Sequence, residues 1–216
     1  MKKFSTLLFA TFACVVAYAQ PTTSDGPYHV SYASNLAVGD SVINITNDGA
    51  SGAGLGFGTT ASVTGSICAN VYAYNADEQV VACCSCPVTP NGLVSLSAKN
   101  DIVFNPLTGG AAGAPTSVVI KVVATAPVGG SCTNSALLGG TPTLVNGLVI
   151  WGTHLHANTS AAAGTYGVTE TTFVSGTLSA GEVARLAYGC GVVANVGSGF
   201  GVCNSCRLGG LGSVQQ

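Results

Sequence analysis

The sequence predicts a mainly β protein: an Ig-like or jelly-roll-type β-sandwich with one C-terminal helix and a disulfide-stapled tail. Short runs of alternating or β-branched residues recur along the chain, separated by Gly-, Pro- and Asn-rich turns, which is typical of sandwiches and barrels. Helix signals are strong at one segment near the C-terminus. Cysteines are frequent for a chain of this length, 9 in 216 residues, which is typical of an exported, disulfide-bonded protein.

The N-terminus has the pattern of a secretory signal peptide. Two lysines follow Met1, an apolar run extends from Phe4 to Ala19, and the run ends in the small-x-small tripeptide Ala17-Tyr18-Ala19. The run is shorter than the roughly 20 residues of a membrane-spanning helix. We therefore expect a signal peptide at 1–19, a β-sandwich domain at 20–175, and a helix with a Cys-rich tail packed on the same domain at 176–216. The expected location is secreted or extracellular, with no membrane span in the mature form.

Charged residues are unusually scarce. They make up 6% of the chain, compared with about 25% in ordinary globular proteins. After loss of the signal peptide the remaining cations are Lys99, Lys121, Arg185 and Arg207. So few cations exclude nucleic acid as a partner, because nucleic-acid binding depends on many Lys and Arg contacts to phosphate. Little charge repulsion would oppose contact between copies of this chain, so we expect self-association.

The strands are predicted from period-2 alternation and β-branched content. The expected strands are Tyr28–Ala33, Ser41–Asn47, Ile67–Tyr74, Gln79–Cys84, Leu93–Ala98, Asp101–Phe104, Ser117–Ala124, Leu144–His156 and Tyr166–Phe173. The segment 118–123 is apolar on both faces apart from one lysine, so it should be a central strand. The Gly- and Ala-rich stretches 49–66 and 109–115 predict loops or flexible hairpins.

The helix begins at a capping box. In Ser179-Ala180-Gly181-Glu182, the serine should be the N-cap and the glutamate should reach back to its amide. Apolar residues then recur at helical spacing on one face; they are Val183, Leu186, Ala187 and Cys190. Gly197 or Gly199 should end the helix.

Eight cysteines remain after the signal peptide, and we expect all of them in disulfides. They are Cys68, Cys83, Cys84, Cys86, Cys132, Cys190, Cys203 and Cys206. Neighbouring side chains of a strand point to opposite faces, so Cys83 should pair away from Cys84 and Cys86. A four-thiolate zinc site and a redox CxxC are the alternatives.

Three segments of the mature chain resemble a group of small secreted Cys-rich proteins of environmental bacteria. They are Ser66-Ile-Cys-Ala-Asn-Val-Tyr, Cys83-Cys-Ser-Cys-Pro-Val-Thr-Pro-Asn-Gly-Leu and Cys203-Asn-Ser-Cys-Arg-Leu-Gly-Gly-Leu-Gly. The group has no assigned function. The resemblance implies an extracellular location and supplies no catalytic residue.

The sequence contains neither a G-x-S-x-G elbow nor an HExxH motif. We therefore expect that the protein is not an enzyme. The carboxylates are more suggestive. Asp40, Asn44, Thr46 and Asp48 share one face of a predicted strand, and Asp77 and Asp101 lie in or beside turns. Oxygen ligands of this kind suit Ca²⁺. We therefore take Asp40, Asn44, Asp48, Asp77 and Asp101 as candidate calcium ligands, with turn formation as the alternative reading.

Two histidines, His154 and His156, are one residue apart in a predicted strand, so both rings lie on one face. They suit zinc or copper if a third ligand approaches, and a solvated strand face is the simpler reading. Trp151 lies within the same apolar run and is expected in the core. The leading hypothesis is a self-assembling subunit of an extracellular fibre, matrix or surface layer, stabilised by calcium. The alternative is an extracellular glycan- or metal-binding module.

Overall fold

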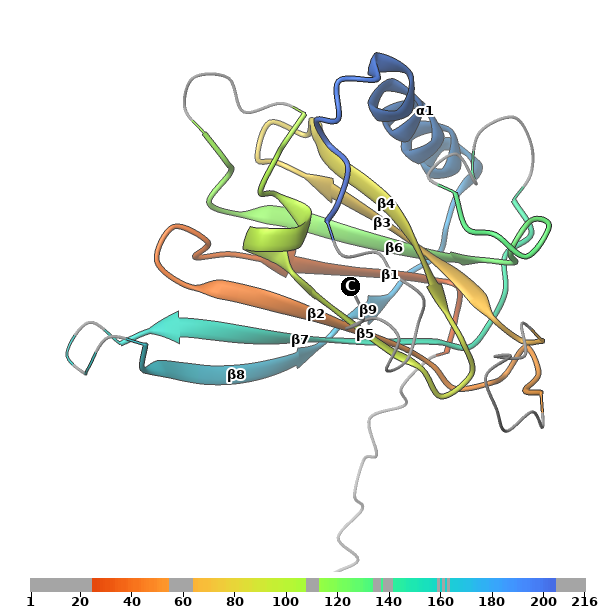
Figure 1. The fold of residues 1–216 in the computed structure, drawn as a ribbon, viewed down its shortest axis with the longest axis horizontal. Helices are drawn as coiled ribbons and strands as arrows, with labels where there is room; N and C mark the ends of the chain where they lie inside the picture. Colours follow the sequence, from red (N-terminus) through yellow and green to blue (C-terminus); the bar gives the residue numbers. More distant parts are fainter. Residues whose placement is uncertain are drawn as a thin grey trace, which may run out of the picture.

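Two antiparallel β-sheets lie face to face, and one helix covers the outer face of the larger sheet (Figure 1). This computed structural model describes residues 25–54, 64–107, 113–133, 137, 142–158, 160, 162 and 164–204. The mainly β fold with a C-terminal helix and disulfides reaching the C-terminal region, predicted from the sequence, is confirmed. The predicted signal peptide lies outside the described residues, as do residues 55–63 and 109–112 of the two predicted loops.

The five-stranded sheet has the order β4-β3-β6-β1-β9. Its strands are β1 (Tyr28–Ala33), β3 (Ile67–Tyr74), β4 (Val80–Val88), β6 (Val118–Thr125) and β9 (Val174–Ser175). The predicted central strand is confirmed, because β6 pairs with β3 on one side and with β1 on the other. Its apolar composition follows from this position, since a middle strand in a middle layer is buried on both faces.

The four-stranded sheet has the order β5-β2-β7-β8. Its strands are β2 (Asp40–Asn47), β5 (Leu93–Ser97), β7 (Leu148–Ala157) and β8 (Tyr166–Thr172). Along β2 the buried positions alternate with half-buried ones, so Ile43 and Ile45 enter the core as predicted. The chain then passes from β8 through the buried Phe173 into β9, which pairs with β1. This crossover links the two sheets along one side of the sandwich.

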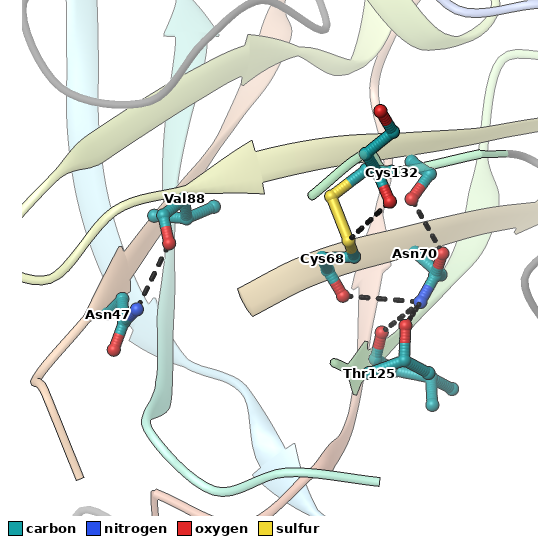
Figure 2. Close-up of a disulfide and its surroundings, with 9 residues drawn as sticks. Asn47, Cys68, Asn70, Val88, Thr125 and Cys132 are labelled. Atoms are coloured by element: carbon teal, nitrogen blue, oxygen red, sulfur yellow. Dashed lines mark hydrogen bonds between the residues drawn. A yellow bond between two sulfur atoms is a disulfide. The ribbon is translucent and has the colours of Figure 1, made fainter. Parts of the chain in front are cut away.

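Two buried asparagines join strands through hydrogen bonds (Figure 2). The Asn70 amide donates to Val123 O at 2.9 Å and to Thr125 Oγ1 at 3.0 Å, and its Oδ1 accepts from Ser85 Oγ at 2.7 Å. These bonds tie β3 to both of its neighbours. Asn47 on β2 donates to Val88 O at 3.0 Å and so links the two sheets. Most buried polar groups in proteins are hydrogen-bonded in this way.

Three sequence predictions of strands need correction. The predicted strand Leu144–His156 begins too early, because β7 begins at Leu148 and Leu144 forms an isolated bridge with Thr125. The predicted strand Asp101–Phe104 is wrong, because the chain forms a π-helical turn at Ala98–Ile102. Asp101 accepts a bond from the Ser97 amide at 2.7 Å, so this aspartate stabilises the turn. β4 continues past its predicted end at Cys84 to Val88. Pro87 is tolerated there because β4 pairs with β3 on one side and has no regular strand on the other.

The helix α1 spans Ala180–Val196, with Ser179 as the N-cap and Gly197 in the left-handed conformation at its end. The Ser179 hydroxyl accepts from the Glu182 amide at 3.2 Å, as predicted. The Glu182 carboxylate does not reach back to the N-cap amide in the described structure. It accepts instead from Lys121 Nζ on β6 at 2.5 Å, which anchors the helix to the sheet.

Gly189 sets how closely the helix approaches β4. A Cβ atom at this position would lie 3.1 Å from Cγ1 of Val80. Glycine lowers helix propensity, but at position 189 it allows this close packing; Gly189 and Gly191 are both buried. Leu186 and Cys190 are buried as predicted, whereas Val183 and Ala187 are only partly buried.

The disulfides are Cys68–Cys132, Cys83–Cys190 and Cys84–Cys203, and Cys86 is disulfide-bonded as well. Cys83 lies in the cluster beneath α1, whereas Cys84 and Cys86 lie in the core between the sheets, so the predicted separation is confirmed. The zinc and redox alternatives fail for Cys83, Cys84 and Cys203, which are all bonded to distant partners. Cys206 lies outside the described residues. No helix in the described part of the chain is long and apolar enough to cross a membrane.

Candidate functional site

The strand β8 is an exposed edge. It ends the four-stranded sheet, its neighbour is β7, and all seven of its residues are exposed. In Figure 1 it forms the margin of the molecule farthest from α1. Two large apolar side chains stand open on it, Tyr166 at 48% and Val168 at 58% exposure. An edge of this length usually carries a lysine, a proline or a bulge that blocks pairing. β8 has none of these, and its single charge is Glu170.

The hydrogen bonds at the two ends of the β7–β8 ladder show which backbone groups face outward. Asn158 N donates to Thr165 O, and Phe173 N donates to Ile150 O. The register between these bonds has no irregularity. In an antiparallel pair the directly bonded positions alternate. The intervening bonded positions of β8 are Gly167, Thr169 and Thr171, so the outward amide and carbonyl groups belong to Tyr166, Val168, Glu170 and Thr172.

The edge of β4 is covered by the C-terminal segment. Cys83 forms a parallel bridge with Val202, and its amide donates to Gly201 O at 2.9 Å. The disulfide Cys84–Cys203 fixes this segment in place. The side of β4 that faces away from β3 is therefore covered by the protein's own C-terminal segment.

The two remaining edges are short. β9 has two residues and β5 has five. At the end of β5 the Ser97 amide is already bonded to the Asp101 carboxylate. Among the described residues, β8 is thus the edge with the longest run of free backbone groups.

The candidate calcium ligands lie in separate places. Asp40 accepts from the Lys99 amide at 3.0 Å and from Ser97 Oγ at 2.5 Å, and Asp101 accepts from the Ser97 amide. Ser97 therefore brings these two carboxylates to one end of β2. Asp48 lies at the other end, about 26 Å away for eight residues of strand. Its carboxylate accepts from the Ala50 amide at 2.9 Å.

Asn44 and Asp77 have structural roles as well. Asp77 lies in the tight turn between β3 and β4, where its amide donates to Asn75 Oδ1. Asn44 is held on the outer face of the four-stranded sheet by a polar ladder that crosses every strand. Ser95 Oγ donates to Asn44 Oδ1 at 2.7 Å, Asn44 Nδ2 donates to Thr153 Oγ1 at 2.9 Å, and Thr153 Oγ1 donates to Glu170 Oε1 at 3.2 Å. The ladder ends at the open edge.

His154 and His156 lie on the same face of β7 as the buried Ile150; His154 is half-buried there, whereas His156, nearer the end of the hairpin, is exposed to solvent. His154 joins three strands, because its Nδ1 is 2.8 Å from Ser41 Oγ on β2 and its Nε2 is 2.8 Å from Thr171 Oγ1 on β8. His156 Nε2 is 2.8 Å from Thr169 Oγ1. The two ring centroids are 6.5 Å apart.

These rings border a pocket of about 210 Å³ between the hairpin and the end of β1. Its lining includes Tyr32, Asn35, Asp40, His154 and His156. Burial, and secondarily the charge of His156, lowers the pKa of His154 below 6.5. His154 is therefore neutral at physiological pH, with one ring nitrogen donating and the other accepting.

Among the described residues, the pocket does not arrange a serine, His154 and a carboxylate as a catalytic triad. Ser41, the hydroxyl beside His154, is buried at 1% exposure, and the second ring nitrogen of His154 meets a threonine where a triad has a carboxylate. In the described residues no three His, Cys, Asp or Glu side chains gather closely enough to hold a metal ion. Trp151, expected in the core, is only half-buried because its odd position on β7 points outward.

Comparison with known proteins finds no match to the chain among family models, curated proteins or solved structures.

Sequence reasoning predicted a strand at 166–173 but did not identify it as an open edge. A signal was present, because this run contains one charge, no proline and no lysine. Edge position itself depends on the order of strands in the sheet, which local alternation does not determine.

Proposed function

We propose that this protein is a secreted structural protein that associates with copies of itself through the open edge of β8, as a building unit of an extracellular fibre, matrix or surface layer. The observation that carries the proposal is the fully exposed β8, whose outward backbone groups have no hydrogen-bond partner among the residues that the structure describes. Main-chain pairing at such an edge is a common way for chains to associate.

The disulfides and the distribution of edges support this proposal. Disulfide bonds persist in oxidising, extracellular surroundings, and this chain has one that fixes its own C-terminal segment over β4. The same chain leaves β8 open. Scarce charge removes the repulsion that keeps ordinary monomers apart.

The test compares two proline variants at neighbouring positions of β8. Val168→Pro removes an outward amide donor and leaves the β7 ladder intact, whereas Thr169→Pro removes a donor within that ladder. We expect Val168→Pro to abolish association at concentrations where the wild type associates, with a small change in stability. Thr169→Pro should mainly lower stability. Light scattering after gel filtration and negative-stain microscopy measure association, and urea denaturation measures stability.

Wild-type protein that stays monomeric at millimolar concentration would overturn the proposal. So would a Val168→Pro variant that associates as well as the wild type. The stability measurement keeps these outcomes distinct from simple unfolding.

A second candidate function is glycan binding at the pocket beside His156. The observation in its favour is the exposed ring of Tyr32, 55% accessible, beside the polar side chains of Asn35, Asp40 and His156. Sugars stack on aromatic rings and bond to such groups. Binding to a panel of oligosaccharides that is lost in Tyr32→Ala and kept in Tyr188→Ala, an exposed tyrosine on α1, would support this function. Equal binding by both variants would reject it.

A further inference from the structure

We infer that the partner of β8 is the β8 strand of a second copy, paired antiparallel about a two-fold axis that passes through Thr169. This inference rests on the proposed self-association and adds its partner strand, its register and its symmetry. The result is one continuous eight-stranded sheet across two molecules, built from the four-stranded sheet of each.

The register follows from which residues face outward. Two antiparallel edges bond fully only when outward residues of one strand meet outward residues of the other. Centring the axis on Thr169 brings Val168 opposite Glu170 of the second copy and Tyr166 opposite Thr172. These residues are the outward set of the strand. Every outward amide and carbonyl of β8 then finds a partner, which gives about eight new backbone hydrogen bonds.

Two neighbouring registers also bring outward residues together. The one centred on Val168 leaves Thr172 without an outward partner on β8, and the charges of the strand disfavour the one centred on Glu170. A two-fold axis at Glu170 would place its carboxylate directly opposite the same carboxylate of the second copy, and like charges in that position are unfavourable. In the register centred on Thr169, Glu170 faces the valine. The inward-facing neighbours, Gly167 and Thr171, meet each other on the opposite face, where the glycine leaves room for the threonine.

The alternative partner, the β5 edge, offers fewer outward backbone groups for pairing. β2 directs the backbone groups of Ile43 and Ile45 toward β5, so the outward residues of β5 are Leu93 and Ser95. The Ser97 amide, next in the series, is already bonded to Asp101. A head-to-tail contact between β8 and β5 would leave much of the β8 edge unpaired, whereas contact between two β8 strands pairs all of it.

The direct test places a charge opposite Glu170. In the inferred register Val168→Lys forms an ion pair with Glu170 of the second copy, and symmetry makes this pair twice. Each pair strengthens association by up to about fivefold. Val168→Glu sets two carboxylates opposite each other, twice, and weakens association by a similar factor. Position 168 is 58% exposed, so neither side chain has to be buried in the monomer.

Sedimentation equilibrium measures the dissociation constant of each variant. We expect the Val168→Lys variant to associate most tightly, the wild type next and the Val168→Glu variant least. We also expect Glu170→Gln to remove the gain of Val168→Lys. If both charges weaken association equally, the register is wrong. Leu93→Pro, which removes an outward donor of β5, should leave association unchanged.

The failures of the two proposals are distinguishable. If Leu93→Pro and Val168→Pro both abolish association, the contact is head-to-tail: the two-fold inference fails and self-association through β8 stands. If neither has any effect, self-association through β8 fails and the two-fold inference fails with it.

Discussion

The disulfide between Cys84 and Cys203 joins residues 119 positions apart and holds the C-terminal segment against the edge of β4. Cys83, the neighbour of Cys84, is bonded to Cys190 in the helix. Because Cys83–Cys190 already ties the helix to β4, the Cys84–Cys203 bond closes only a small ring. This ring consists of the segment from Cys190 to Cys203 together with Cys83 and Cys84.

Replacing Cys84 and Cys203 together with alanine should lower the free energy of unfolding by up to about 3 kcal/mol. This upper value corresponds to a ring of about 15 residues, which is what the Cys83–Cys190 bond leaves to be closed, and a bond from Cys86 to Cys206 would make the ring and the loss smaller. The upper value is smaller than the loss expected for a loop spanning the full separation. Urea denaturation checks it. The variant should remain folded, since the two alanine side chains are small enough to fit where the cysteines were. A loss well above this value would mean that Cys83–Cys190 does not form in solution.

Mapping of the disulfides should identify Cys206 as the partner of Cys86. The described bonds account for Cys68, Cys83 and Cys84 with their partners, and Cys86 is disulfide-bonded too. If all eight cysteines after the signal peptide are paired, as the sequence predicts, Cys206 is the one left. Peptic digestion at acid pH, which suppresses exchange, followed by mass spectrometry checks this. A free thiol at Cys206 would contradict it.

Ser179→Ala should cost about 1 kcal/mol of stability, because the serine hydroxyl accepts the amide of Glu182 at the start of α1. Ser160→Ala, an exposed serine at the tip of the β7–β8 hairpin, is the matched control and should cost little. Thermal or urea denaturation measures both. Equal midpoints for the two variants would show that the cap contributes nothing to stability.

Stability should fall as the pH drops below about 6.5. Burial lowers the pKa of both His29 and His154 below this ordinary value. Below pH 6.5 the unfolded chain therefore binds more protons than the native one, and stability rises with pH across this window. The full contribution is present above 6.5 and is lost as the pH falls toward the folded-state values. His154→Gln should flatten part of the profile of urea midpoint against pH, and an unchanged slope would contradict the prediction for this residue.

Several strands were predicted almost to the residue, and β1 and β3 were predicted with their observed bounds. The sequence did not predict the π-helical turn at Ala98–Ile102, since the turn depends on Asp101 reaching the Ser97 amide. The face on which Trp151 lies was misjudged for a related reason. An apolar run does not show which of its two faces meets the core, and the register with β2 decides it.

The candidate site was predictable only in part. The histidine pair was correctly placed on one face of a strand, whereas the self-association expected from the low charge stays a prediction. The order β5-β2-β7-β8 makes β8 an edge, and this order arises from pairing between segments more than 100 residues apart, such as Asp40 with Leu155. The calcium hypothesis grouped Asp40, Asn44 and Asp48 by strand face and added Asp77 and Asp101 from turns. In the structure Asp40 and Asp101 meet at Ser97, whereas Asp48 lies beyond the other end of β2 and Asp77 in the β3–β4 turn.

Replacing Glu170 with glutamine should strengthen self-association. Glu170 is the single charge on β8, and in the inferred pair the two Glu170 carboxylates occupy diagonal positions on one face, where cross-strand neighbours still interact. The substitution removes this repulsion. It keeps an oxygen that accepts the bond from Thr153 Oγ1, so the polar ladder is retained.

The dissociation constant of Glu170→Gln should therefore fall, and its dependence on salt should disappear, because added salt relieves only the repulsion that the variant lacks. Glu78→Gln, a change of the same kind in the β3–β4 turn where the carboxylate meets Arg185, is the matched control. Sedimentation equilibrium at low and high salt measures both variants. If Glu170→Gln associates more weakly than the wild type, Glu170 forms an attractive contact across the interface, and two β8 strands do not meet in the inferred register.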